Sequence, residues 1–571
     1  MDKHLLQYEG SKKIMAIVGL LTVAQAVAII TQAIYLAKAI TQMFHGEPFR
    51  VYMESFVLFF VAHLFRQALQ WAKERISYRF AIRVSEYERG RLIEKTFEIG
   101  PDIIGTHGSG NLITLALEGV PKYRKYVELF IPRFLSMALI PMILVIFILT
   151  TDLLSGVTLI IVMPILIVFL ILIGLVSQKK VDEQMESYRL LSRHFVDSLR
   201  GLVTLKFLGR SRAHEGAIAT VSNKYRIATN RALKYAFVSS FALDFFSSLS
   251  VALIAVELGM KLINGTILLE PALLVLILAP DYFLPVRELG NDFHATTDGK
   301  DAGEEIRKVL AMKAPEKSTE PMRIEEEGTF AFQGVSKYGD EGQLLLNDLH
   351  FTVGHQDKIG IVGLSGSGKS TLIRLLAGFT TFEEGHVQIN EQSFSTLNNA
   401  NWHERLAYIP QHPTIFSASV LDNLRFYEPD APFEQVVKAA KTVGLYELIQ
   451  SFPNQFEEKI GQGGRALSGG EEQRIALART LLRQSDIMLF DEPTAHLDIE
   501  TEHDIKEIIV PLLENHLVFF ATHRMHWMKN MDRILVLDHG ELVQFGTYEQ
   551  LSQVEGKFRE MLVASQKGGA A

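Results

Sequence analysis

The residues Gly363 to Thr371 read GLSGSGKST, and this short stretch decides the fold of the second half of the chain. It fits the pattern G-x-x-x-x-G-K-[ST], with the apolar run KIGIV before it and the helix-like TLIRLLAGF from Thr371 onward. In that context, successive backbone N–H groups curl around a phosphate, and the following helix points its positive end at the anion. Lys369 can reach the β- and γ-phosphate oxygens, and Ser370 can bind magnesium. The stretch therefore predicts an ATP site, with binding residues Gly363, Ser365, Gly366, Gly368, Lys369, Ser370 and Thr371.

Composition limits the class of protein. The chain has 571 residues, a formal net charge of −8 and no cysteine. Its length exceeds that of a single domain, and the long uncharged runs crowd into its first half. A negative net charge gives no sign of the basic face that a general nucleic-acid binder needs, so we expect no nucleic-acid partner. Without cysteine, neither a disulfide framework nor a thiolate metal site can form.

Six apolar segments in the first half are long enough to cross a lipid bilayer. The first, Ile14 to Ala37, holds no charged residue and is about twice as long as the apolar core of a signal peptide, so we expect an uncleaved span. The second is less pure, because it contains Glu54, His63 and Arg66. The other five predicted spans are Val51–Ala72, Phe130–Thr150, Leu153–Ser177, Ala236–Lys261 and Ile267–Val286.

The charge of the connecting segments predicts their side of the membrane. The segments 73–126 and 178–235 are rich in Lys and Arg, whereas the three opposite connections are short and carry little positive charge. The positive-inside rule then places the N-terminus, both long segments and the C-terminal half in the cytoplasm. Helical periodicity continues through both segments, so we expect the membrane helices to extend into the cytosol, with turns near His107–Asn111 and Asp197–Leu202.

A polar, charged segment separates the two halves. The sequence KAPEKSTEPMRIEEEG predicts a linker over residues 312–327, between a membrane domain (1–311) and a nucleotide-binding domain (328–571). Strand-like and helix-like stretches alternate after the linker, which is typical of a parallel sheet with crossover helices. The predicted fold is an all-α six-helix transmembrane domain followed by an α/β P-loop domain.

Acidic residues after a buried strand predict the chemistry of the second domain. The apolar run Ile487 to Phe490 ends in Asp491 and Glu492, a carboxylate that can hold magnesium beside one that can orient or deprotonate a water. His523 ends another apolar strand, HLVFFATH, where an imidazole can contact the γ-phosphate. Gln411 follows the strand-like LAYIP. We expect catalytic roles for Glu492, His523 and Gln411, and a magnesium site made by Ser370, Gln411 and Asp491.

Two further motifs predict contacts to the nucleotide. Tyr338, in FQGVSKYGD, precedes the phosphate loop at a position where its ring can stack on adenine; a simple packed aromatic is the alternative. The stretch LSGGE, Leu467 to Glu471, begins a helix, and Ser468 and Gly470 there can donate hydrogen bonds to a phosphate.

The order of these motifs resembles a known family. The phosphate loop, Gln411, LSGGE, MLFDE, AHLD and His523 look like the ATP-binding cassette over about Thr329 to Val563, and the six spans look like a half-transporter of the exporter type. This resemblance implies head-to-tail cassette dimers, with ATP held between one subunit's phosphate loop and its partner's LSGGE. A single chain then cannot complete a site. Two departures from the family pattern are mild. Glu471 ends the LSGGE stretch where the family more often has Gln, and the loop after the carboxylates reads AHLD where SALD is more common.

Two segments of the first half resemble a narrower group. LILAPDYFLPVRELGNDFHA, Leu276 to Ala295, and HFVDSLRGLVTLKFLGRSRA, His194 to Ala213, look like the CydD-type subunit of bacterial CydDC transporters. That resemblance implies a CydC-like partner half in a heterodimer of the bacterial inner membrane. It also implies a small-molecule cargo, either haem or a thiol reductant such as glutathione or cysteine, in support of cytochrome bd assembly. An exporter half for lipid, drug or peptide, or an ATP-gated regulator of the same fold, is the alternative.

Ionisable residues within the predicted spans are candidates for cargo contacts. His63 and Arg66 lie about one helical turn apart on one face of the second span, where such residues usually face a cavity or a partner helix. His63 could also be an axial ligand of haem iron, or a packed, hydrogen-bonded histidine. For Asp244 and Asp281 we expect pairing with other helices or solvation in a cavity.

Overall fold

The computed structural model describes residues 5–101, 108–318, 322, 328–339, 342–483, 485–495 and 497–568. The chain divides into two compact units. One is helical and comprises Met1–Thr96 and His107–Met312; the other is an α/β unit of Lys313–Ala571 together with Phe97–Thr106.

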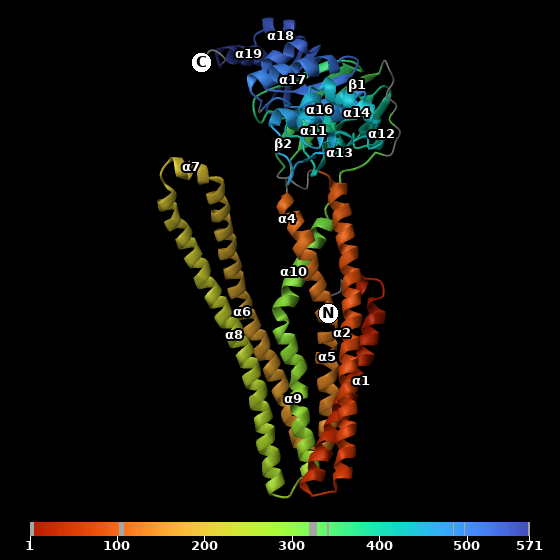
Figure 1. Ribbon diagram of the computed structural model, residues 1–571, viewed down its shortest axis with the longest axis vertical. Coiled ribbons are helices and arrows are strands. Elements are labelled where there is room, and N and C mark those ends of the chain that lie inside the picture. The colour runs from red at the N-terminus through yellow and green to blue at the C-terminus, as the bar shows by residue number, and fades with distance from the viewer. Residues whose placement is uncertain are drawn as a thin grey trace. The chain divides into compact units, whose positions relative to one another are not determined.

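The helical unit is built from helices much longer than those of ordinary globular domains (Figure 1). Its buried core lies where α1, α5, α6, α8 and α9 meet. On α5, Ile140, Leu144 and Ile148 recur every four residues and are buried, because that spacing places them on one helix face. The elements are η1 Leu5–Gln7, α1 Ser11–Phe44, α2 Phe49–Ile99, α4 Ser109–Thr114, η2 Leu115–Gly119, α5 Val120–Thr151, α6 Leu153–Arg200, α7 Leu202–Phe207, α8 Ser211–Ile263, α9 Leu269–Asn291 and α10 Phe293–Leu310.

Five of the six predicted spans lie within one helix each, namely α1, α2, α5, α6 and α8; the sixth, Ile267–Val286, begins two residues before α9 (Leu269–Asn291). Four helical stretches of the described residues are long and apolar enough to cross a membrane: Ser11–Phe44, Gly110–Thr151, Asp244–Ile263 and Leu269–Asn291. The apolar stretch Leu153–Phe169 of α6 is shorter. The first half of α2 does not reach the same hydropathy, since it mixes apolar residues with polar and charged ones.

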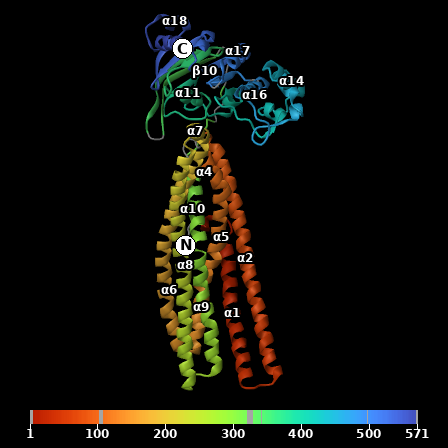
Figure 2. The same ribbon diagram turned by 60° about the vertical axis from the view of Figure 1, so that its left-hand side comes forward.

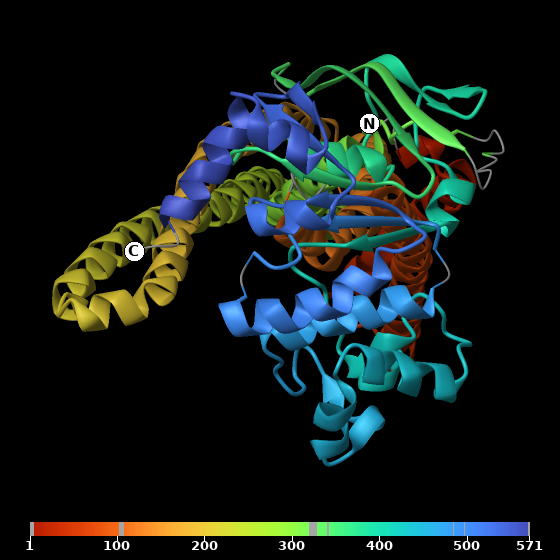
Figure 3. The same cartoon turned by 90° about the horizontal axis from the view of Figure 1, so that it is seen from above.

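The helices continue past the predicted spans, as expected from their periodicity. α6 and α8 run side by side as a long hairpin that reverses through α7 (Figures 1 and 2; end-on in Figure 3). The predicted turn at Asp197–Leu202 is confirmed, and the reversal extends to Gly209, which has a positive φ of 64°. Of the other predicted turn, His107 lies outside the described residues, and Gly108, with φ 74°, precedes α4.

The α/β unit holds the predicted parallel sheet. Its strand order is β12-β11-β3-β10-β9-β6, with β12 alone antiparallel to its neighbour. β9 and β10 are buried along their whole length, which explains why both read as continuous apolar runs. The strands are β3 Lys358–Val362, β6 Leu406–Ile409, β9 Ile487–Asp491, β10 Leu517–Ala521, β11 Arg533–Asp538 and β12 Glu541–Gly546.

A second sheet of four antiparallel strands, in the order β2-β1-β4-β5, is an addition that the sequence interpretation missed. Its strands are β1 Thr329–Tyr338, β2 Leu344–Gly354, β4 Glu384–Ile389 and β5 Gln392–Phe394. Phe332 of β1 stacks on Phe351 of β2 with ring centroids 4.3 Å apart, within a core shared with β3 and α11. Expecting every strand to alternate with a helix was therefore wrong for this part of the unit.

Helices and a small ribbon complete the α/β unit. A second buried core gathers residues of α13, α14, α16 and α17 against the parallel sheet. The remaining elements are α11 Lys369–Leu376, α12 Ala400–Glu404, β7 Ala418–Ser419, α13 Val420–Leu424, α14 Phe433–Thr442, α15 Tyr446–Ser451, η3 Gln455–Glu457, β8 Lys459–Ile460, α16 Gly469–Leu482, α17 Ile499–Leu512, η4 Met525–Asn530, α18 Tyr548–Gln553 and α19 Lys557–Gly568.

Candidate active site

The loop between β3 and α11 has the shape that the GLSGSGKST motif predicts. Gly368, with φ 102°, caps the N-terminus of α11 in a conformation that other residues rarely adopt. A Cβ atom on Gly363 would lie 2.3 Å from the backbone oxygen of Leu537 and equally close to Ser367 Oγ. Glycine is therefore required where the chain leaves β3, and it lets the loop curl over the N-terminus of α11.

Lys369 is held inside this loop. Its Nζ donates to the carbonyl oxygens of Gly363 at 2.9 Å and Leu364 at 3.2 Å, and lies 3.8 Å from Glu492 Oε1. Burial lowers the pKa of Lys369, and the nearby carboxylates of Glu492 and Asp491 oppose that shift. The ammonium is thus pre-positioned by backbone oxygens, which a phosphate can replace as partners.

Asp491 and Ser370 come together where β9 ends and α11 begins. Ser370 Oγ donates to Asp491 Oδ1 at 3.2 Å, and burial raises the pKa of that carboxyl. Magnesium prefers oxygen ligands and often uses one or two carboxylates together with substrate phosphates. The hydroxyl and the carboxylate are ligands that fit such an ion, and Gln411, which lines the same cavity as Ser370, carries a side-chain oxygen of the same kind.

Glu492 and His523 follow neighbouring strands, so the register of the sheet brings them together. β9 and β10 pair in parallel, with Ala521 opposite Asp491. His523 Nδ1 lies 3.2 Å from Glu492 Oε2. Glu492 has a positive φ of 49°, a strained conformation for this residue type and one often found at functional sites. The carboxylate and the imidazole therefore form one unit at the carboxyl edge of the sheet.

A cavity of about 870 Å³ collects most of the predicted residues. From the sequence we expected Ser365, Gly366, Gly368, Lys369, Ser370, Thr371, Gln411, Glu492 and His523 at the site, and all of these line the cavity. Leu344, Leu345 and His539 also line it and were missed. His539 occupies the tight β11–β12 turn with φ 49°, and the sequence DHG between two strand-like runs could have indicated that turn.

Five of the predicted nucleotide-site residues are not among those that line this cavity: Tyr338, Gly363, Ser468, Gly470 and Asp491. Tyr338 ends β1, and its hydroxyl donates to Glu384 Oε1 at 3.2 Å; the charge of Glu384 raises the pKa of the phenol. Ser468 caps α16 and forms a reciprocal capping box with Glu471, whose Oε2 accepts from the Ser468 N–H at 2.7 Å. The unusual Glu471 of the LSGGE stretch thus has a structural role.

A buried carboxylate holds the two loops that carry Glu492 and His523. Glu502 of α17 is 7% exposed; its Oε1 accepts from Thr494 Oγ1 at 3.1 Å and from Trp527 Nε1 at 3.2 Å. It also pairs with the guanidinium of Arg524. Thr494 lies two residues after Glu492, and Arg524 directly follows His523. Glu502 was not expected from the sequence, since an acidic residue on an amphipathic helix is usually solvated.

The helical unit contains a separate polar cavity of about 190 Å³ between α1, α2, α5 and α9. Arg66 lines it and pairs with Asp281 through two hydrogen bonds, of 2.6 and 3.1 Å. His63 does not line the cavity; its ring stacks on Phe59, and its buried Nδ1 has no hydrogen-bond partner among the described residues. Asp244 pairs with Arg287 at 2.5 Å, so both aspartates pair with other helices, as expected.

Comparison with known proteins identifies the family. The family described as "ABC transporter transmembrane region" matches residues 15–279, and the one described as "ABC transporter" matches residues 346–495. The Bacillus subtilis (strain 168) "Glutathione/L-cysteine transport system ATP-binding/permease protein CydC" is 46% identical and aligns over 99% of each chain. The Escherichia coli (strain K12) protein of the same description named CydD is 28% identical, over 98% of this chain and 96% of its own.

A solved structure agrees with the fold. The structure described as "a bacterial Atm1-family ABC exporter with ATP bound" has a TM-score of 0.80 with 22% identity, and each chain is covered to 99%. The predicted fold, a helical transmembrane region followed by an α/β ATP-binding domain, is therefore confirmed. The chain is a multi-pass membrane half-transporter of the CydC/CydD family of ABC exporters, and its α/β unit is an ATPase that couples ATP hydrolysis to transport.

Proposed function

We propose that this chain is the CydD-type half of a heterodimeric transporter whose other half is CydC-like. The segments Leu276–Ala295 and His194–Ala213 support the CydD assignment, as do full-length relatives with that name. The 46% identical relative bears the CydC name, which favours the opposite assignment. Co-expression with a CydC-type and with a CydD-type half from the same bacterium decides between them: the proposal predicts a stable 1:1 complex with the CydC-type half and none with the other.

The proposed cargo is a thiol reductant such as glutathione or cysteine, moved across the bacterial inner membrane in support of cytochrome bd assembly. The observation that carries this proposal is the full-length similarity to proteins named for glutathione and L-cysteine transport. Haem is the second expected cargo, and the feature that would favour it is the buried Nδ1 of His63, which has no hydrogen-bond partner in the described part of the chain.

We assign the chemical steps of ATP hydrolysis to the residues around the larger cavity. Lys369 and the phosphate loop bind the β- and γ-phosphates, and Glu492 orients and deprotonates the attacking water while His523 contacts the γ-phosphate. Ser370, Gln411 and Asp491 would hold Mg²⁺, which when bound neutralises phosphate charge. Tyr338 stacks on adenine.

Ser468 and Gly470 act on the other nucleotide of the pair. Their position at the N-terminus of α16, together with the head-to-tail cassette dimers that the family resemblance implies, supports a role toward the ATP on the partner's loop. Two bridging ATP molecules then favour a closed dimer, and hydrolysis removes the bridging γ-phosphate. ATP can shift the conformation of the nucleotide-binding domain (328–571) only if it binds the two conformations of that domain with different affinity. The linker 312–327 would pass that shift to the membrane domain (1–311).

The proposed cargo is tested by ATPase stimulation. The reconstituted heterodimer is assayed with glutathione, L-cysteine and haem, and a haem absorption spectrum is recorded for wild type and His63→Ala. The proposal predicts stimulation by a thiol and no spectral difference between the two proteins. Stimulation by haem alone, with a spectrum that changes in His63→Ala, would reject a thiol cargo in favour of haem.

A further inference from the structure

We propose that the 190 Å³ cavity of the helical unit recognises an α-amino-acid head group, with the cargo's carboxylate at Arg66 and its ammonium at Asp281 and Glu288. The inference rests on the proposed transport function and adds the part of the cargo that this chain recognises. Cysteine carries such a head group, and so does the γ-glutamyl end of glutathione.

The cavity has the charge pattern of a zwitterion site. Its lining holds two cations, Arg66 and Lys73, and two anions, Asp281 and Glu288, among the described residues. Arg66 and Asp281 lie within predicted spans, where charged groups are costly and usually mark a pathway for substrate, and Lys73 and Glu288 lie just beyond the ends of those spans. A zwitterion adds no net charge to this balanced set, whereas a dicarboxylate such as haem adds uncompensated negative charge.

The ion pair between Arg66 and Asp281 offers a place for the carboxylate. Its fork-to-fork geometry, with Nη2 to Oδ1 at 2.6 Å and Nη1 to Oδ2 at 3.1 Å, is the geometry in which arginine binds any carboxylate. A cargo carboxylate can therefore replace Asp281 without loss of hydrogen bonds. The displaced aspartate is then free to accept from the cargo's ammonium, so one exchange accommodates both charges.

A buried amide supplies an unused acceptor at the same cavity. Gln25 is 7% exposed, and its Nε2 donates to Gln70 Oε1 at 3.1 Å. Its Oε1 has no hydrogen-bond partner among the described residues, although buried polar atoms almost always have one. An ammonium group in the cavity would satisfy this oxygen.

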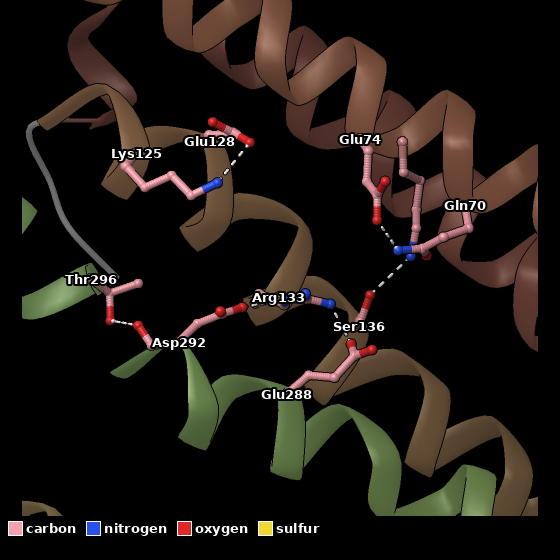
Figure 4. A network of polar contacts seen from close by, with 10 residues as sticks. Gln70, Glu74, Lys125, Glu128, Arg133, Ser136, Glu288, Asp292 and Thr296 are labelled. Carbon is pink, nitrogen blue, oxygen red and sulfur yellow. Dashed lines mark hydrogen bonds and ion pairs between the residues drawn. The ribbon is translucent and has the colours of Figure 1, made fainter. Parts of the chain in front are cut away.

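Residues of α5 hold two of the charged side chains that line the cavity, Lys73 and, as Figure 4 shows, Glu288. Lys73 is 2% exposed, and its Nζ donates to Ser136 Oγ of α5 at 3.0 Å. Arg133, also on α5, binds Glu288 and donates to Asp292 Oδ2 at 2.7 Å (Figure 4). The Glu288 carboxylate is therefore held in place at the cavity before cargo arrives, as a pre-organised site requires.

Four thiols test the head-group requirement by equilibrium binding to the purified complex with its co-expressed partner. L-cysteine and glutathione carry both charges, cysteamine lacks the carboxylate, and 3-mercaptopropionate lacks the ammonium. We expect cysteine and glutathione to bind at least about tenfold more tightly than the other two, because each missing charge removes charge-assisted hydrogen bonds. Equal affinity for cysteamine or 3-mercaptopropionate would overturn the inference.

Variants test the assigned residues. Arg66→Gln should weaken cysteine binding at least about tenfold, and Arg226→Gln, at an exposed position of α8, should leave it unchanged. Arg66→Gln alone leaves the Asp281 carboxylate buried without its partner, which could impair folding. The double variant Arg66→Gln/Asp281→Asn removes both charges and so keeps the charge of the cavity balanced. Normal cysteine binding by that double variant would overturn the site.

Cysteine binding and ATP-driven transport, measured on the same complex, distinguish failure of the head-group site from failure of the proposed transport function. Failure of wild type to bind cysteine and glutathione, in a complex that still shows ATP-driven transport of either thiol, overturns the head-group site and leaves the proposed function standing. Binding that follows the predicted order, with no transport, supports the site and rejects the transport of these thiols.

Discussion

Replacing Glu492 by glutamine should slow ATP hydrolysis at this chain's phosphate loop by about 10²- to 10⁴-fold, the usual contribution of a general base. The carboxylate lies 3.2 Å from His523 and 3.8 Å from the ammonium of Lys369. Glutamine keeps the size of the side chain and cannot accept the water's proton. The substitution also removes a negative charge from the cavity, so ATP should bind at least as tightly as to wild type.

The assay must isolate one of two composite sites. The partner's site is silenced by changing the carboxylate that corresponds to Glu492, and phosphate release and retained nucleotide are measured on the reconstituted complex. We expect slow release together with trapped ATP. Glu507→Gln, at an exposed position of α17, is the matched control and should hydrolyse ATP normally. Near-normal hydrolysis by Glu492→Gln in this background would refute its role as the base.

Three other substitutions address neighbouring groups. Lys369→Ala should weaken ATP binding by about tenfold or more, measured by nucleotide titration, because it removes the cation aimed at the phosphates; unchanged affinity would contradict this. Asp491→Asn should abolish magnesium-dependent hydrolysis and, at pH values above the raised pKa of Asp491, raise the unfolding temperature of the nucleotide-free complex. Burial raises the pKa of Asp491, so the ionised carboxylate opposes folding once the pH exceeds the ordinary pKa of Asp, and most strongly above the raised pKa. A lower unfolding temperature would reject this account. Glu502→Ala should destabilise the nucleotide-binding domain by about 3 kcal/mol and lower its unfolding temperature, since Arg524 and Trp527 lose their buried partner; an unchanged temperature would reject the buried cluster.

The nucleotide site was largely predictable from sequence, because its residues follow strands whose apolar runs are easy to recognise. Lys369, Ser370, Gln411, Glu492 and His523 were expected at one site, and they line one cavity. The carboxyl ends of adjacent parallel strands share one edge of the sheet, so local motifs were enough to bring them together.

Contacts between distant segments were not predictable in the same way. Arg66 and Asp281 are 215 residues apart, and their side chains meet only at the cavity of the helical unit, so their pairing has no local signal. The carboxylate of Glu502 is buried by side chains from two loops on either side of it in sequence. The antiparallel sheet was not expected because its strands fall among turns and short helices. There, the spacing of apolar residues along a strand does not tell a parallel sheet from an antiparallel one.

Flux into sealed vesicles tests most directly whether ATP hydrolysis drives transport through this chain. The reconstituted heterodimer is given radiolabelled cysteine or glutathione with ATP, with a non-hydrolysable ATP analogue, or with ATP in the Glu492→Gln complex whose partner site is silenced. We expect accumulation against a gradient only when the wild-type complex is given ATP. Equal flux with the non-hydrolysable analogue, running only down the gradient, would instead indicate an ATP-gated channel and contradict the account.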